Sequence, residues 1–258
     1  MASEYELRSL CTTNLSVHYG GVVANDGVDL SVSPGMIVGL IGPNGAGKTT
    51  FVDAVTGFAD YSGSVSLGDV LLDGMPPHIR RRRGLSRTWQ AGELFGNLTV
   101  AQNVEAAARW GGLNAVWRDL FGRRRAGPDP SVERALAAVE LRQFGATLAR
   151  DLSLGQQKLV GVARALVGNC GLLLLDEPAA GLDSQESLDF ADRLRKIVTN
   201  GPGALLIDHD MSLVLSVCDH VYVMEFGKII ASGTPEEVRV NPAVIRAYLG
   251  APMEPGHA

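Results

Sequence analysis

The stretch GPNGAGKTT, residues 42–50, decides the fold. It fits the pattern G-x-x-x-x-G-K-[ST], and it lies between the strand-like apolar run MIVGLI and the helix-like run TTFVDAVTGF. Glycines let the backbone turn its N–H groups toward phosphate oxygens, and the helix that follows offers its positive N-terminus. We therefore expect a strand, a phosphate-binding loop and a helix, in this order.

The residues of this loop predict a bound nucleotide. Lys48 can reach the outer phosphates, and the hydroxyl of Thr49 can ligate Mg²⁺. The cofactors that we expect are therefore ATP and Mg²⁺. The residues predicted to contact the nucleotide here are Gly42, Pro43, Asn44, Gly45, Ala46, Gly47, Lys48, Thr49 and Thr50.

A second stretch, LLLLDEP at residues 172–178, predicts the catalytic carboxylates. An apolar strand here delivers two adjacent acids to its carboxyl end, where sheets of this class bind ligands. Because adjacent strand residues point to opposite sides, Asp176 and Glu177 can have different roles. Asp176 suits the Mg²⁺ shell, and Glu177 can accept a proton from a water that attacks the γ-phosphate, a role worth about 10²–10⁴ in rate. Taken alone, the stretch is also compatible with a polar strand end before Pro178.

Length, composition and charge are those of a globular α/β protein. The 258 residues suffice for one large domain, or for one domain with an inserted subdomain. The net charge of −5 gives no general attraction to nucleic acid, so we expect no nucleic-acid partner. Cys11, Cys170 and Cys218 lack metal-ligand spacing and are predicted to be buried or reduced thiols. No apolar run is long enough for a membrane span, so we expect the chain not to cross a membrane.

The hydrophobic pattern changes twice along the chain. Short β-biased runs bounded by glycine and aspartate fill the first hundred residues or so. From about residue 99 to 148 the pattern becomes alanine-rich and helical, with apolar residues at i, i+3, i+4 and i+7 from Val132 to Val139. After Gly171 strands alternate with helices, one of them at about 184–199. This alternation predicts a parallel sheet flanked by helices.

Six motifs in one order resemble those of the ATP-binding subunits of ABC transporters, and the likeness covers nearly the whole chain. Beyond the two stretches above, the chain has RTWQ with Gln90, the signature-like LSLGQQ, AAGLDS with Asp183, and LLIDHDM with His209. The resemblance implies an α/β fold, with a P-loop NTPase (RecA-like) core that contains a mixed sheet, an antiparallel β subdomain and an inserted α-helical subdomain.

The resemblance also implies domain boundaries. It makes residues 1–250 a single ATPase domain, with the core and the β subdomain in 1–98 and 168–250. The helical subdomain, including the signature helix, is expected at about 99–167. Residues 251–258 are expected to form a disordered tail.

The same resemblance assigns roles to single residues. It implies that Gln90 offers an oxygen to Mg²⁺ and the attacking water, and that His209 hydrogen-bonds the γ-phosphate. Tyr19 resembles the aromatic residue that stacks on adenine, a contact of about 1–3 kcal/mol in nucleic-acid complexes, although core packing of this ring is an alternative. The implied catalytic set is Glu177, His209 and Gln90, and the implied metal set is Thr49, Gln90 and Asp176. Asp183 is expected beside the nucleotide.

The signature departs from the familiar pattern at one position. Leu154 stands where a second glycine is common. In the family this motif contacts ATP held by a second subunit, and Ser153, Gly155 and a helix that begins near Gln156 supply the necessary groups. Leucine disfavours positive φ, so we expect Leu154 to have negative φ with the phosphate contacts retained. A degenerate subunit that does not hydrolyse ATP is the alternative.

The branch of the family is indicated by four further features. GLSRTWQAGELFGNLTVAQNV, the segment through WRDLFGRRRAGPDP, the non-glycine signature position and the ending IRAYLG resemble the ATP-binding subunits of branched-chain amino acid importers. Such a subunit pairs with an identical or homologous one around two ATP molecules, and hydrolysis reopens the pair. The motion drives a transmembrane permease, served by an external solute-binding protein, from the cytoplasmic face of the cell membrane.

Other assignments stay open at this point. An ATPase of lipopolysaccharide export has similar length and motifs, and urea or amide importers share the branch. A non-transport ABC ATPase that works on DNA or ribosomes, or a nucleotide-binding regulator without catalysis, is the alternative outside transport.

Two surface features are also predicted. The clusters Arg80–Arg83 and Arg123–Arg125 are expected in solvated loops, with anionic lipid or nucleic acid as alternative partners. The segment Ala91–Leu98 is where subunits of this family receive a short helix of the permease. Glu93, Leu94 and Phe95 are our candidates for that groove.

Overall fold

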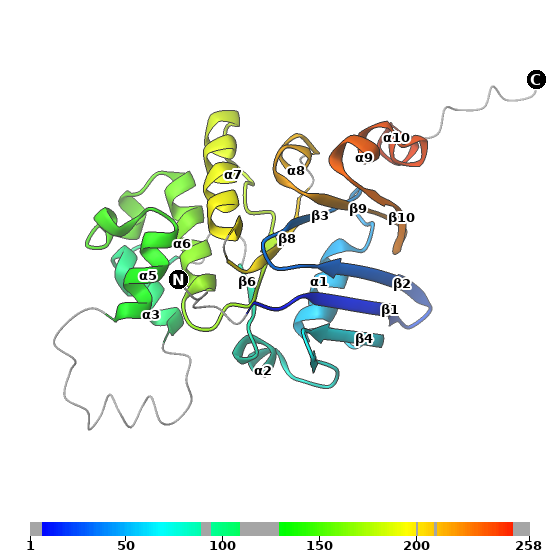
Figure 1. Cartoon of the computed structure of the whole chain (residues 1–258), viewed down its shortest axis with the longest axis horizontal. Coiled ribbons are helices and arrows are strands. Elements are labelled where there is room, and N and C mark those ends of the chain that lie inside the picture. Colours follow the sequence, from blue (N-terminus) through cyan, green and yellow to red (C-terminus); the bar gives the residue numbers. More distant parts are fainter. Residues whose placement is uncertain (1–6, 89–93, 109–128, 200, 209–210, 250–258) are drawn as a thin grey trace, which may run out of the picture.

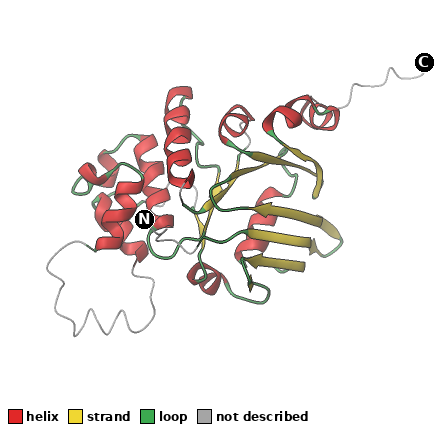
Figure 2. Ribbon diagram, viewed as in Figure 1, coloured by secondary structure: helices red, strands yellow, loops and turns green. Residues whose placement is uncertain are grey.

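Two sheets and two groups of helices make up the molecule (Figures 1 and 2). The computed structural model describes residues 7–88, 94–108, 129–199, 201–208 and 211–249. The strands are β1 (Leu10–Tyr19), β2 (Val22–Val32), β3 (Ile37–Ile41), β4 (Ser62–Leu67), β5 (Val70–Leu71), β6 (Leu85–Arg87), β7 (Leu172–Asp176), β8 (Gly203–Ile207), β9 (His220–Glu225) and β10 (Lys228–Gly233).

The α-helices pack around the two sheets, and those from the middle of the chain, drawn in green, fill the left side of Figure 1. They are α1 (Lys48–Thr56), α2 (Pro77–Arg82), α3 (Val100–Ala108), α5 (Pro130–Ala138), α6 (Leu154–Leu166), α7 (Ser184–Thr199), α8 (Met211–Val217), α9 (Pro235–Val240) and α10 (Pro242–Leu249). Two short 3₁₀ helices, at Arg142–Phe144 and Ala149–Asp151, lie between α5 and α6. Among the described residues, none of the helices has the length and apolarity needed to cross a bilayer.

The larger sheet is mixed, as expected. Its order is β10-β9-β3-β8-β7-β6, and only the edge strand β10 is antiparallel to its neighbour. Strands β3, β7 and β8 are buried at every residue, which explains their continuous apolar runs. Because these three strands are parallel neighbours, their carboxyl ends lie at one edge, and this edge carries the phosphate loop, Glu177 and Asp208.

The smaller sheet is antiparallel, with the order β2-β1-β4-β5. Its inner residues, such as Leu15 and Val65, form one hydrophobic cluster with α1 and with one face of the larger sheet. Phe51 and Val55 of α1 are fully buried in this cluster. The helix that follows the phosphate loop is therefore packed between two sheets.

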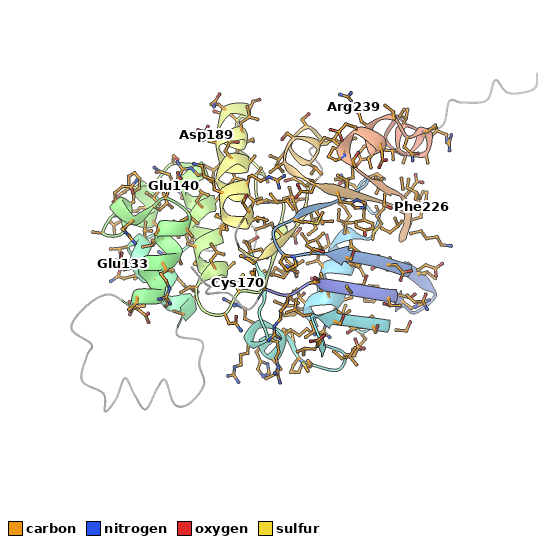
Figure 3. All side chains as sticks on the ribbon, in the orientation of Figure 1. Glu133, Glu140, Cys170, Asp189, Phe226 and Arg239 are labelled. Atoms are coloured by element: carbon orange, nitrogen blue, oxygen red, sulfur yellow. The ribbon has the colours of Figure 1, made fainter. Side chains whose placement is uncertain are left out.

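The helices α3, α5 and α6 pack against one another, and with α7 and α8 they form a second hydrophobic cluster with the opposite face of the larger sheet. The predicted helical period holds, since Val132, Ala135, Leu136 and Val139 are all buried. Asp129 begins α5 as its N-cap, accepting a hydrogen bond from the Ser131 amide at 2.9 Å. Glu140, which follows α5, lies beside α7 and accepts a hydrogen bond from Lys196 at 2.9 Å (Figure 3).

The three cysteines lie in described segments, and all are free thiols. Cys170 and Cys218 are buried, and Cys11 is exposed on β1. Burial raises the pKa of the Cys170 thiol to about 11. Cys170 and Cys218 are therefore buried, as expected, whereas Cys11 is not.

The expectation for the first arginine cluster is wrong. Residues 77–82 form the helix α2, and Arg80 on this helix is only 3% exposed. Its guanidinium donates to the carbonyl oxygens of Met75 at 2.8 Å, Ala54 at 3.0 Å and Val55 at 2.7 Å. Arg80 thus closes the C-terminal end of α1, where carbonyls lack helical partners.

The neighbouring Arg81 binds the end of a different helix. Its guanidinium donates to the carbonyl oxygens of Ala165 at 3.1 Å, Val167 at 2.8 Å and Asn169 at 3.3 Å, at the C-terminus of α6. The sequence could not show these partners, because they are far away along the chain. Arg82 and Arg83 are exposed, as expected for the whole cluster, and Arg123–Arg125 lie outside the described residues.

We predict that Arg80→Ala lowers the free energy of unfolding by about 2–4 kcal/mol, because buried carbonyl groups at the end of α1 lose their donor. Urea denaturation of the nucleotide-free protein measures the change. Arg82→Ala on the exposed side of α2 is the matched control and is expected to stay within about 0.5 kcal/mol of the parent. Equal losses in the two variants would show that the carbonyl contacts do not stabilise the fold.

Candidate functional site

The phosphate loop is held in place by its surroundings. Within the loop, the Ala46 amide donates to the carbonyl of Pro43 at 3.1 Å. From outside, the Gly227 amide donates to the Ala46 carbonyl at 2.9 Å, and the buried Asn25 side chain donates to the Gly47 carbonyl at 3.2 Å. The loop is therefore fixed by β2 and by the turn between β9 and β10.

The N-terminus of α1 faces the loop without a side-chain cap. Gly47 precedes the helix in the left-handed conformation, with φ of 104° and ψ of 4°, and in the described segments no side chain caps the first turn. The first amide groups of a helix have no internal acceptor, and the helix dipole places positive charge there. Lys48, Thr49 and Thr50 lie in this first turn, so the arrangement suits an anion.

Lys48 joins the loop to the acidic ends of the neighbouring strands. Its Nζ donates to the carbonyl oxygens of Gly42 at 2.6 Å and Pro43 at 3.1 Å. Burial lowers the pKa of Lys48, and the charges of Glu177, Asp176 and Asp208 oppose that shift. Lys48 and the three carboxylates therefore converge at the carboxyl edge of the larger sheet.

The two predicted carboxylates differ in their backbone. Asp176 is the last residue of β7 and is 8% exposed. Glu177 has left the strand: its φ is 45°, and its amide donates to the Ile207 carbonyl at 2.8 Å. A left-handed glutamate is strained, and such strain is often found at functional sites. Glu177 therefore lies in a backbone turn after the strand, so the strand alternation that we expected does not apply to this pair.

Arg87 is a residue of this site that the sequence argument missed. It ends β6 beside β7, and its guanidinium donates to Asp53 Oδ1 at 2.7 Å and to Asp176 Oδ2 at 2.8 Å. Asp53 lies on α1 about one turn after Thr49, on the same face of the helix. That spacing, together with the arginine in RTWQ, was the signal available in the sequence.

The signature motif forms the start of α6. Ser153 is the N-cap, and its Oγ accepts a hydrogen bond from the Gln156 amide at 3.3 Å. The Gln156 side chain accepts in turn from the Ser153 amide at 3.0 Å, which completes a capping box. The helix therefore begins at Leu154, earlier than our expectation near Gln156. Leu154 has helical backbone without positive φ, as we predicted.

The loop before α7 lies against the signature. Asp183 caps α7, since its Oδ1 accepts from the Glu186 amide at 2.8 Å. A Cβ built on Gly181 would lie 3.3 Å from Leu154 Cδ2, and one built on Gly155 would lie 3.7 Å from Glu186 Oε1. The side chain of Leu154 thus packs against this loop, so the leucine has a contact that a glycine would lack.

Other predicted residues have simpler outcomes. Tyr19 ends β1 and is 56% exposed, so the alternative of core packing is wrong for this ring. Leu94 packs against the core, and Phe95 is 55% exposed. Three predicted site residues, Gln90, Glu93 and His209, lie outside the described residues.

The oxygen donors at this edge fit Mg²⁺. The hydroxyl of Thr49 and the carboxylate of Asp176 are ligands that a hard cation prefers. In the described part of the chain no group of three or more His, Cys, Asp or Glu residues could hold a metal ion by itself. Mg²⁺ usually takes one or two protein groups and completes its shell with water and substrate phosphates. The donor set therefore suits a cation that arrives with a nucleotide.

Comparison with known families agrees with this geometry. The profile described as ABC transporter matches residues 25–180, which include the phosphate loop, Arg87, the signature and both carboxylates. The chain belongs to the ABC transporter family of ATPases. A second profile, described as branched-chain amino acid ATP-binding cassette transporter, matches residues 228–253 of this family member.

Several curated relatives in the ABC transporter family cover nearly the whole chain. BraF of Pseudomonas aeruginosa, a high-affinity branched-chain amino acid transport ATP-binding protein, is 38% identical over 92% of this chain and 96% of its own. LivG of Escherichia coli K12, which bears the same description, is 37% identical over 93% and 97%. The lipopolysaccharide export protein LptB of Escherichia coli K12 is 33% identical over 95% and 98%.

A solved ABC cassette confirms the fold class. The crystal structure of the ADP conformation of an ATP-binding cassette of an ABC transporter superposes with a TM-score of 0.82. It is 30% identical and covers 95% of this chain and 100% of its own.

We predict that Gly47→Ala damages the phosphate loop far more than Gly45→Ala. Both glycines have positive φ, which costs an alanine about 1–2 kcal/mol. A Cβ on Gly47 would in addition lie 2.4 Å from the Ala24 carbonyl oxygen, whereas one on Gly45 would meet nothing within 4 Å among the described residues. Urea denaturation should give a loss of about 3–5 kcal/mol for Gly47→Ala. Equal losses in the two variants would contradict the clash.

Proposed function

We propose that this chain is the ATP-hydrolysing subunit of an importer for branched-chain or related amino acids. The convergence of Lys48 with Asp176, Glu177 and Asp208 beside the open N-terminus of α1 is the observation that carries the proposal. It combines an anion site with carboxylates that can serve a metal and a water molecule. The likeness to BraF and LivG and the match of the C-terminal profile support the branch.

In this proposal the phosphate loop holds the triphosphate of ATP and Tyr19 stacks on the adenine. The residues at the loop are Gly42, Pro43, Asn44, Gly45, Ala46, Gly47, Lys48, Thr49 and Thr50. Bound Mg²⁺ would neutralise charge on the β- and γ-phosphates, with Thr49, Asp176 and Gln90 as the protein groups around it.

Hydrolysis of ATP needs a group that accepts a proton from the attacking water, and the carboxylates at this edge of the sheet can supply it. Glu177, whose backbone is left-handed, takes a proton from the attacking water. Gln90 orients the same water, and His209 hydrogen-bonds the γ-phosphate.

A second subunit completes each site in the proposed mechanism. Ser153, Gly155 and the first turn of α6 offer a hydroxyl and amide groups to a phosphate held by the partner. Asp183, on the loop against which Leu154 packs, lies on the same surface. Two ATP molecules close the pair and hydrolysis reopens it.

In the proposed mechanism, the closing and reopening of the subunit pair drives a membrane protein that carries the cargo. The subunit acts at the cytoplasmic face of the membrane, bound to a transmembrane permease that receives its cargo from an external solute-binding protein. Phe95 is exposed beside α3, and it remains our candidate for a permease contact.

We predict that Glu177→Gln retains ATP binding but loses at least about 10²-fold in turnover, because the amide cannot accept the proton. Steady-state hydrolysis and light scattering with and without Mg-ATP measure both properties. Asp189→Asn, at an exposed carboxylate of α7, is the matched control and should behave like the parent (Figure 3).

The outcomes of this experiment separate the alternatives. An ATP-dependent dimer of Glu177→Gln supports a closing pair, whereas parental turnover in this variant would remove Glu177 as the base. A parent chain that binds ATP and never hydrolyses it, alone or with a copurified permease, would favour the non-catalytic regulator. Copurification with ribosomes or DNA in place of a permease would favour the non-transport ATPase.

We further predict that Ser153→Asp separates helix capping from phosphate contact. Aspartate is a good N-cap, so the unfolding free energy without nucleotide should stay within about 0.5 kcal/mol, whereas Ser153→Ala should lose about 1 kcal/mol. The new carboxylate repels a phosphate, so ATP-dependent dimerisation of Ser153→Asp in the Glu177→Gln background should be lost. Undiminished dimerisation would exclude Ser153 from the composite site.

A further inference from the structure

We propose that Arg87 is a positioning residue that orients the Asp176 carboxylate for Mg²⁺ and couples this carboxylate to α1. The inference rests on the proposed function, in which Asp176 and Thr49 belong to the Mg²⁺ shell. None of the motifs in the sequence assigns a role to Arg87 or to Asp53.

The guanidinium bridges two elements that carry the expected metal ligands. It donates through Nη2 to Asp176 Oδ2 at 2.8 Å, at the end of β7, and through Nη1 to Asp53 Oδ1 at 2.7 Å, on α1. The side chains of Arg87 and Asp176 are 10% and 9% exposed, so water screens this pair poorly. The planar fork of arginine fixes both carboxylates at once.

This contact distinguishes the two oxygens of the Asp176 carboxylate. The bond from Arg87 engages Oδ2, and we assign Oδ1 as the oxygen that would meet Mg²⁺ or a water in its shell. Groups that hydrogen-bond a metal ligand from behind typically change metal affinity 10–100-fold when they are lost.

The second carboxylate adjusts the charge. Arg87 with Asp176 alone would be a neutral pair, which attracts a cation weakly. Asp53 adds a second negative charge, so the three side chains together carry one net negative charge toward the metal position. The side chain of Asp53 is 35% exposed, so it balances the positive charge of the guanidinium from the side that faces water.

The contact also fixes a distance. Asp53 and Thr49 lie about one turn apart on one face of α1, so Arg87 ties the helix with the metal-binding hydroxyl to the strand with the metal-binding carboxylate. A displacement of α1 relative to β7 would have to break or bend this bridge. The separation of the two ligands is thus set before the nucleotide arrives.

The test measures the Mg²⁺ dependence of nucleotide binding rather than hydrolysis. A fluorescent ATP analogue is bound to the full chain in EDTA, and Mg²⁺ is then titrated. The main variant is Arg87→Lys, which keeps the charge but loses the fork. For it we expect nucleotide affinity in EDTA within twofold of the parent and a Mg²⁺ midpoint raised 10–100-fold. Arg82→Lys on the exposed side of α2 is the matched control and should leave both values unchanged.

The results decide between positioning and simple structural support. A parental Mg²⁺ midpoint in Arg87→Lys, or an equal loss of affinity in EDTA, would overturn the inference and leave the proposed function standing. If the parent itself gains no affinity from Mg²⁺, the proposed function fails and the inference fails with it.

A second variant keeps the test decisive if Arg87→Lys does not fold, as judged by circular dichroism. Asp53→Asn leaves the hydrogen bond from Arg87 to Asp176 in place. It removes one negative charge and the ion pair that holds Arg87 to α1. Its Mg²⁺ midpoint should rise at least threefold with binding in EDTA unchanged, and a parental midpoint would overturn the inference.

Discussion

The packing of α1 between two sheets is the constraint on which the site depends. Burial of Phe51 and Val55 holds α1 in place between the sheets, but the hydrophobic effect has no direction and does not by itself satisfy the polar groups at the helix ends. At the C-terminal end Arg80 satisfies the carbonyls, and at the N-terminal end the amides stay open beside the loop. The carbonyl groups at the buried end of α1 therefore have hydrogen-bond donors, and the amide groups at the other end are available to an anion. The carboxyl ends of β3, β7 and β8 then bring the loop and the acidic residues to the same edge.

The sequence predicted those features whose signals are local. The phosphate loop, the parallel sheet and the period from Val132 to Val139 depend on neighbouring residues, and the structure confirms them. The capping box of Ser153 and Gln156 was readable too, as S-x-x-Q before an apolar helix, and overlooking it placed the helix start too late. The left-handed backbone of Glu177 was not readable, because tertiary contacts hold it.

The cluster Arg80–Arg83 shows that the sequence did not predict contacts between residues far apart along the chain. Four arginines in a row suggest a solvated charge cluster, since nothing in their spacing separates the buried side chains from the exposed ones. Apart from Met75, the carbonyl partners of Arg80 and Arg81 named above lie 25 to 88 residues away along the chain. Only the folded molecule brings these carbonyls within reach. The same holds for Arg87, whose two carboxylates belong to different elements of the core.

The helix α2 has a consequence for the dynamics of the chain. Its adjacent residues Arg80 and Arg81 hold the last carbonyls of α1 and of α6. Proteins open locally in cooperative units, and a unit is defined by contacts that must be broken together. Detachment of α2 would remove a donor from the last carbonyls of both helices at once. The C-terminal ends of α1, the helix after the phosphate loop, and of α6, the signature helix, are therefore linked through one short helix.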